Sequence, residues 1–226
     1  MPGKIIASAR KLGRDVLFED ESKLLAAAAG IPVVESYAAA TEQEAAALAE
    51  LIGYPAVLKV RSTAFSHKSD SGGVRLNLSG PDAVRRAFLE ITDHARGEDP
   101  QAGVTVQRMA EPGIEVIIGA AFDPHFGPVI MFGLGGVFTE ILDDHCFRMV
   151  PVGKSDASAM VRSLRGSRLL QGYRNIPPVD LEAIEGILTA VSDLMQNYQE
   201  ITELDLNPVT VYPQGALALD ARIKLK

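Results

Sequence analysis

Two apolar segments separated by a short polar turn set the fold class of this chain. Residues 114–122 and 127–132 have the composition of strands, and only Asp123-Pro124-His125-Phe126 lies between them. A connection this short joins antiparallel strands, because parallel strands need a crossover of a dozen residues or more. Strands joined by tight turns and flanked by helices occur in both halves of the chain. We therefore predict an α+β protein built on antiparallel sheets rather than on one parallel Rossmann sheet.

Local patterns predict helices and strands along the whole chain. A helix over residues 19–29 ends at Gly30, and Thr41 with Glu44 forms a capping box for a helix that reaches Leu51. The other expected helices cover 83–95, 155–164 and 180–195, and the other expected strands cover 31–37, 54–60, 73–78, 104–107, 137–142, 146–150, 201–206 and 216–220.

The segment of residues 96–103 has the Gly- and Pro-containing composition of a linker. It predicts two α+β subdomains, residues 1–105 and 106–226, with a ligand cleft between them. The formal net charge of -7 argues against a broad nucleic-acid surface. The single cysteine, Cys146, excludes an internal disulfide and fits a reducing compartment, and no Cys/His cluster suggests zinc.

We expect neither a signal peptide nor a membrane span in this sequence. The N-terminal residues lack the long apolar core of a signal peptide, and no apolar stretch approaches the roughly 20 residues that span a bilayer. We expect a cytoplasmic protein without a membrane partner.

The segment of residues 59–74 has the composition of a phosphate-handling loop. Lys59 ends an apolar run, and the polar residues that follow include His67 and the pair Gly72-Gly73. A cation neutralises phosphate, glycines let the backbone approach it closely, and a neutral imidazole nitrogen can accept a phosphoryl group. On composition alone a solvated loop histidine without a role is the favoured interpretation of His67, and a simple turn stays open for the glycine pair.

Two familiar nucleotide motifs are present only in part. Gly153-Lys154-Ser155 resembles the end of a Walker loop, but Arg148 stands where the first glycine of that motif is required. Gly133-Leu134-Gly135-Gly136 begins like a dinucleotide fingerprint, but Phe138 stands at the position of its last glycine. Nucleotide binding is therefore expected on another architecture.

A series of short motifs follows one after another along the chain. They are Leu58-Lys59-Val60, His67-Lys68-Ser69-Asp70-Ser71-Gly72-Gly73-Val74, Gln107-Arg108-Met109, Gly113-Ile114-Glu115-Val116-Ile117-Ile118-Gly119, Asp123-Pro124-His125-Phe126-Gly127-Pro128, Phe132-Gly133-Leu134-Gly135-Gly136, Glu203-Leu204-Asp205-Leu206-Asn207-Pro208 and Leu219-Asp220-Ala221-Arg222. In this order they resemble the ATP-grasp β subunit of the ADP-forming acyl-CoA synthetases, a family that includes the ADP-forming acetate–CoA ligases. The resemblance runs from about Leu12 to the end of the sequence.

The resemblance implies an ATP-grasp fold of two α+β subdomains and a ligase that uses ATP or ADP with Mg²⁺. The family converts an acyl-CoA, ADP and phosphate reversibly to a free acid, CoA and ATP. A CoA-binding α part forms the acyl phosphate, and a loop histidine of the β subunit, at the position of His67, carries the phosphoryl group to ADP. A chain of 226 residues lacks room for CoA-binding domains, so the resemblance implies a hetero-oligomer with an α subunit.

The family pattern also implies ligands for the nucleotide. Lys59 would neutralise the α and β phosphates, with Gly72 and Gly73 close to phosphate. Gln107, Arg108 and Met109 would contact adenine, mainly through backbone groups, and Glu115 would bind the ribose hydroxyls. An exposed strand-end lysine and an outward-facing strand glutamate are the alternatives without a function.

Catalytic and metal roles are implied for four further residues. Asn207 and Asp220 would supply an amide oxygen and a carboxylate to Mg²⁺, which takes oxygen ligands and few of them from protein. Asp205 would steady the loop histidine, and Arg148 would stabilise charge on the transferring phosphoryl group. The alternatives are a turn at Asn207-Pro208, a strand end at Asp220 and an arginine on a sheet surface.

Two other functions stay open at this point. One is an ATP-grasp carboxylate–amine ligase that acts through a direct acyl phosphate and needs neither a phosphohistidine nor a CoA partner. The other is a non-catalytic subunit that binds nucleotide for regulation.

Overall fold

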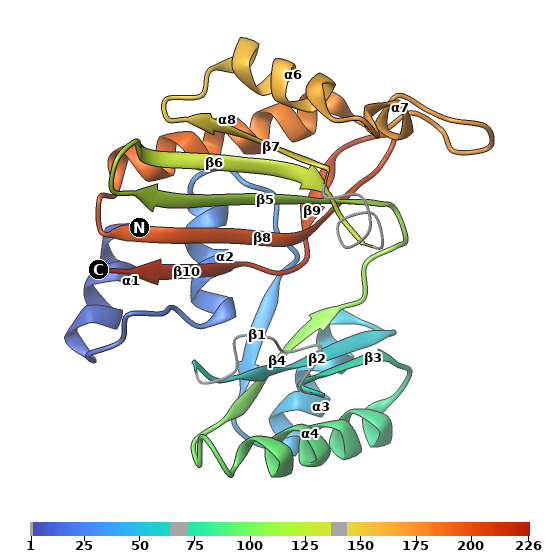
Figure 1. Cartoon of the computed structure of the whole chain (residues 1–226). Coiled ribbons are helices and arrows are strands. Elements are labelled where there is room, and N and C mark those ends of the chain that lie inside the picture. Colours follow the sequence, from blue (N-terminus) through green and yellow to red (C-terminus); the bar gives the residue numbers. More distant parts are fainter. Residues whose placement is uncertain (1, 64–71, 137–143) are drawn as a thin grey trace. The chain divides into compact units, whose positions relative to one another are not determined.

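The computed structural model of the chain describes residues 2–63, 72–136 and 144–226 (Figure 1). These residues form two compact units, and each unit combines segments that are distant in sequence. Unit 1 consists of the residues up to Leu17, Ser22–Val33 and Pro112–Lys226, whereas unit 2 consists of Phe18–Glu21 and Val34–Glu111.

This division differs from a simple cut at residue 105, because most of the first 33 residues belong to unit 1. The reason is hydrophobic: Ile6, Leu25 and Ile31 pack into the same core cluster as the strands that follow Pro112. The first turn of helix α2 (Glu19–Ala28) is the exception and belongs to unit 2.

Unit 2 contains an antiparallel four-stranded sheet with two helices. In spatial order its strands are β1 (Ser36–Ala39), β4 (Gly103–Arg108), β2 (Ala56–Arg61) and β3 (Val74–Leu78), and its helices are α3 (Glu42–Ile52) and α4 (Pro81–Ala95). Side chains of a strand alternate between the two faces. Ala56, Leu58 and Val60 therefore join the core beneath the helices, and Lys59 and Arg61 lie on the opposite face.

The predicted cap of α3 is present. The Thr41 side-chain oxygen accepts a hydrogen bond from the Glu44 N–H, and the Glu44 carboxylate accepts one from the Ala40 N–H. The strand predicted over residues 31–37 is confirmed only at its end, because regular pairing starts at Ser36 and continues to Ala39.

Unit 1 contains a larger antiparallel sheet. Its strands follow the spatial order β10 (Arg222–Leu225), β8 (Ile201–Val211), β5 (Ile114–Asp123), β6 (Gly127–Leu134) and β7 (His145–Met149), with β9 (Ala216–Ala218) paired to β8. The predicted hairpin joins β5 to β6, and the Asp123 carboxylate accepts hydrogen bonds from the N–H groups of His125 and Phe126 in its turn.

Helices cover one face of this sheet. They are α1 (Pro2–Lys11), most of α2, α6 (Lys154–Ser163), α7 (Ser167–Leu170) and α8 (Leu181–Asn197). Figure 1 shows α6 and α8 along the β6 and β7 side of the sheet. The sequence patterns missed α1, α7 and β10, and the predicted strand at residues 137–142 lies outside the described residues. In the part of the chain that the structure describes, no helix has the length and hydropathy needed to cross a membrane.

Candidate functional site

The register of the unit 1 sheet assigns the predicted site residues to its two faces. Asp205 pairs with Gly119, Gly119 with Met131, and Met131 with Phe147. Directly paired residues of antiparallel strands point to the same side. These four residues therefore share the face away from the core cluster, which we call the open face of the unit 1 sheet.

Arg148 lies on the other face. It pairs with Ile130, and Ile130 pairs with Ala120, both of which are buried in the helix-covered core. The exposed Arg148 side chain donates a hydrogen bond to the carbonyl of Phe147. The structure therefore does not bring Arg148 together with Asp205, although the sequence analysis expects catalytic roles for both.

Asn207 lies in a bulge of β8. Leu206 pairs with Ile118 and Val209 pairs with Val116, so Asn207 and Pro208 together oppose a single residue of β5. The strand continues to Val211, and both the predicted strand end at Leu206 and the turn alternative at Asn207-Pro208 are wrong. The bulge leaves Asn207 exposed, and Asn207 follows the core residue Leu206 in the alternation of β8.

A backbone hydrogen bond brings Asp220 to the same bulge. The N–H of Leu219 donates to the carbonyl of Pro208 over 2.9 Å, so the residue after Leu219 lies beside Asn207. Asp220 is half-buried and stands between β9 and β10. Asn207 and Asp220, the two predicted metal ligands, are thus neighbours in space.

Asp205 is electrostatically coupled to this pair. Burial, and then the negative charge of Asp220, raise the pKa of Asp205 from 3.8 to about 6, while Arg222 opposes the shift. Arg222 is the register partner of Asp205 in β10. Two carboxylates held close enough to repel each other form a site that a cation would stabilise.

The oxygen donors of this site fit Mg²⁺. Within the described ranges no group of three or more His, Cys, Asp and Glu side chains could hold a metal by itself. Mg²⁺ commonly takes one or two protein ligands and completes its octahedron with phosphate and water, whereas zinc and calcium sites use more protein ligands. The carboxylate of Asp220 and the amide oxygen of Asn207 would hold the ion in this way.

Glu115 lies on the open face at the start of β5, and a glycine pair packs against it. The N–H of Gly135 donates to the carbonyl of Glu115 over 2.7 Å, and a Cβ at position 135 would lie 2.9 Å from the Glu115 Cβ. Gly136 has a φ of +63°, and a Cβ there would lie 3.4 Å from the Glu115 carboxylate. Gly135 and Gly136, which do not form a dinucleotide fingerprint, therefore let their backbone lie close to Glu115. Sequence patterns do not reveal this role.

Lys59 is buried in unit 2 rather than exposed at a strand end. Its side chain is 8% exposed, and its Nζ lies 2.9 Å from Oε1 of Glu19, whose side chain is 1% exposed. Arg61, two residues further along β2, donates two hydrogen bonds to the Asp20 carboxylate and stacks over the Phe18 ring. The first turn of α2 thus contacts the same sheet face as the predicted phosphate ligand.

The two glycines after the histidine loop close the β2–β3 connection. Gly72 has a φ of +69°, a conformation that strains other residues, and its carbonyl accepts a hydrogen bond from Arg75. The carbonyl of Gly73 accepts a hydrogen bond from the Val60 N–H over 2.7 Å. His67 itself lies outside the described residues.

The predicted adenine segment ends β4. Gln107 is buried, and its side-chain oxygen accepts a hydrogen bond from the Ser36 hydroxyl, whereas Arg108 is exposed. The N–H of Met109 donates to the carbonyl of Pro55 over 2.9 Å. Because the Met109 N–H already has an acceptor, an adenine base at this segment would form hydrogen bonds with other backbone groups.

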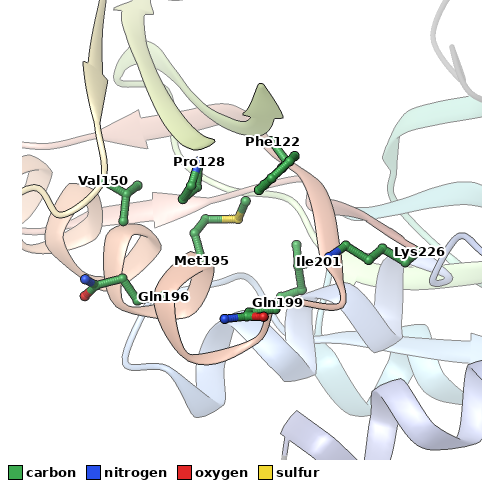
Figure 2. A pocket seen from close by; sticks show the side chains of 8 residues that line it. All are labelled: Phe122, Pro128, Val150, Met195, Gln196, Gln199, Ile201 and Lys226. Carbon is green, nitrogen blue, oxygen red and sulfur yellow. The ribbon is translucent and has the colours of Figure 1, made fainter. Parts of the chain in front are cut away.

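A pocket of about 430 Å³ in unit 1 is separate from these residues (Figure 2). Its apolar walls come from the β5–β6 hairpin and the end of α8, and Lys226 lies at its side. It is lined by Phe122, Pro128, Val150, Met195, Gln196, Gln199, Ile201 and Lys226. None of the predicted site residues that the structure describes lines this pocket.

Comparison with known proteins defines the class of the chain. Residues 8–225 match the family model of the ATP-grasp domain, so the chain belongs to the ATP-grasp family. This finding, with the antiparallel sheets and helices of both units, confirms the predicted α+β ATP-grasp fold.

Within this class the chain belongs with the β subunits of the ADP-forming acetate–CoA ligases, which confirms the resemblance carried by the motifs. It is 43% identical over 225 residues to the β subunit of ADP-forming acetate–CoA ligase I of Pyrococcus furiosus, covering 98% of this chain and 97% of that protein.

Two solved structures of the acetyl-coenzyme A synthetase 1 of Ca. Korarchaeum cryptofilum align with the whole chain at 40% identity, covering 100% of their own chains, with TM-scores of 0.90 and 0.88. The first contains coenzyme A, acetyl-coenzyme A and a phosphorylated phosphohistidine segment in its site I orientation. In the second, with coenzyme A and Mg-AMPPCP, the phosphohistidine segment points towards the nucleotide-binding site.

Proposed function

We propose that this chain is the nucleotide-binding β subunit of an ADP-forming acyl-CoA synthetase, in which His67 exchanges a phosphoryl group with ADP or ATP. The whole enzyme converts an acyl-CoA, ADP and phosphate to a free acid, CoA and ATP. Membership among the acetate–CoA ligase β subunits and the phosphohistidine segments of the Korarchaeum relative support this proposal.

The observation that carries the proposal is the convergence of Asp205, Asn207 and Asp220 on one side of the unit 1 sheet. Phosphoryl transfer needs little covalent chemistry from protein, and its rate comes from positioning and from neutralising phosphate charge. Mg²⁺ held by Asn207 and Asp220 would supply part of that neutralisation. A half-buried carboxylate at Asp205 would orient the imidazole of His67 for the transfer.

Residues of both units have proposed roles towards the nucleotide. Lys59 would bind the α and β phosphates, with Gly72 and Gly73 at the end of the histidine loop. Glu115 would bind the ribose hydroxyls, and the segment 107–109 would contact adenine through its backbone. Arg148 has the weakest support among the predicted residues, because it lies on the helix-covered face of the unit 1 sheet.

A CoA-binding α subunit is the proposed partner. The Pyrococcus relative is a β subunit, and this chain spans nearly the full length of that relative. The partner would bind the acyl-CoA and phosphate, replace CoA by phosphate to give an acyl phosphate and free CoA, and pass the phosphoryl group to His67 through a histidine of its own. The free acid leaves in that step, and His67 then passes the phosphoryl group to ADP.

Reconstitution with the cognate CoA-binding chain tests the function. We expect ATP to form from acetyl-CoA, MgADP and phosphate with the wild-type chain, and to fall to background with His67→Asn. His125→Asn, the same substitution at an exposed hairpin histidine, is the control and should keep the wild-type rate. Full activity of His67→Asn would favour a direct acyl phosphate, and no activity of the wild-type mixture would favour a regulatory subunit.

A further inference from the structure

The buried ion pair of Lys59 and Glu19 connects a proposed phosphate ligand to a residue outside all the motifs above. The two charged atoms lie 2.9 Å apart, and both side chains are almost fully shielded from water. A pair this well buried is not needed for stability alone, since apolar residues in its place are often equally stabilising. Its presence therefore calls for another reason.

The polar side chains around Lys59 come from three elements. Glu19 and Asp20 lie in the first turn of α2, Arg61 lies two residues along β2, and Asp20 is already paired with Arg61. Strand β4 contributes uncharged Thr105, the register partner of Lys59. Lys23, one turn after Glu19 in α2, is a further buried cation. The ammonium of Lys59 donates a hydrogen bond to the carboxylate of Glu19.

Thr105 adds an independent sign that a ligand belongs on this face. Thr105 is fully buried, and among the described residues its hydroxyl has no hydrogen-bond partner. Buried hydroxyls are rarely left unpaired, because an unmade hydrogen bond costs free energy. A phosphate oxygen close to Lys59 would give this hydroxyl an acceptor.

We infer that Glu19 is a positioning residue for nucleotide binding. Its carboxylate keeps the ammonium of Lys59 charged and in place to contact the phosphates of the nucleotide. The inference rests on the proposed function, in which Lys59 contacts phosphate. An ammonium has three donors, so one can remain on Glu19 while the others reach phosphate oxygens. Without Glu19, a buried lysine loses its proton more readily as the pH rises.

Binding of MgADP by the full-length Glu19→Gln variant tests the inference, with calorimetry between pH 6.5 and 9. Glutamine keeps the shape and removes the charge. We expect the ratio of variant to wild-type Kd to rise with pH and to reach about tenfold at the upper end. Glu90→Gln breaks the Arg75–Glu90 ion pair of the same unit and should bind like the wild type at every pH.

Further variants separate the possible causes. Glu19→Asp keeps a carboxylate, so it should bind MgADP more weakly than the wild type but without the new pH dependence. It replaces Glu19→Gln in the test if that variant does not fold. A Kd ratio for Glu19→Gln that stays constant with pH, or equals one, overturns the inference. If Lys59→Met binds MgADP as tightly as the wild type, the proposed function of Lys59 fails instead.

Discussion

The N–H of Leu219 donates a hydrogen bond to the carbonyl of Pro208. This bond ties the segment before β10 to the bulge of β8, so that Asn207 and Asp220 lie side by side. In the proposed site, the amide oxygen of Asn207 and the carboxylate of Asp220 would supply two ligands to Mg²⁺, and phosphate and water would supply the others.

Replacing Asp220 should weaken the binding of the nucleotide together with its metal ion. We expect Asp220→Asn to weaken the affinity for MgADP by tenfold or more, because a neutral amide replaces the charged ligand. Calorimetry with MgADP measures this effect. Asp193→Asn, at an exposed position of α8, is the matched control and should bind normally. Equal affinities of Asp220→Asn and the wild type would contradict the metal assignment.

The raised pKa of Asp205 makes the stability of the folded chain depend on pH. The folded-state value of about 6 lies above 3.8, so ionising Asp205 costs the folded state free energy. That cost is absent below pH 3.8, grows as the pH rises to about 6, and then stays constant at ~3 kcal/mol. In a chelating buffer, Asp205→Asn should therefore stabilise the chain more at pH 8 than at pH 5, as urea titrations would show.

Asp180 provides a control of opposite sign for this pH dependence. Hydrogen bonds from the N–H groups of Gly215 and Ala183 lower the pKa of Asp180, so its ionised form stabilises the folded state. Its contribution is present above pH 3.8 and is lost as the pH falls through the lowered value. Asp180→Asn should destabilise the chain at pH 8. A gain for Asp205→Asn that does not change with pH would show that its carboxylate is not perturbed.

A methyl group at Gly135 should disturb the Glu115 backbone. A Cβ there would lie within 3.0 Å of three Glu115 atoms, and steric overpacking typically costs about 1–3 kcal/mol. We expect Gly135→Ala to lower the free energy of unfolding and the affinity for ADP together. Gly186→Ala is the matched control, because a Cβ at this position of α8 meets no atom within 4 Å. That variant should be as stable as the wild type or more stable. Unchanged stability and ADP affinity of Gly135→Ala would argue against the packing role.

Local features of the fold follow from local patterns in the sequence. Thr41 and Glu44 predict the start of α3, and the short turn between the apolar segments of β5 and β6 predicts an antiparallel hairpin, because these signals depend on neighbours in sequence. The motif order identifies the family. Glu115 and Asp220 could be named from it, although nothing local shows that Asp220 lies beside Asn207.

Features that depend on distant segments could not be predicted in this way. The bulge at Asn207 arises from the register between β8 and β5, and the sequence alone suggests a turn there. The acidic run at the start of α2 gives no sign that Glu19 contacts Lys59, because the two residues are 40 positions apart and meet only through the folding of unit 2. The charge of Arg148 suggests a role towards phosphate, and only the pairing of β7 shows which face of the sheet this residue lies on.

Labelling with ATP tests the central claim that His67 carries a phosphoryl group. The wild-type chain is incubated with Mg²⁺ and ATP labelled in the γ phosphate, and protein-bound label is measured before and after acid treatment. We expect acid-labile label on the wild type and on His125→Asn, and none on His67→Asn. Label that persists on His67→Asn would contradict the account.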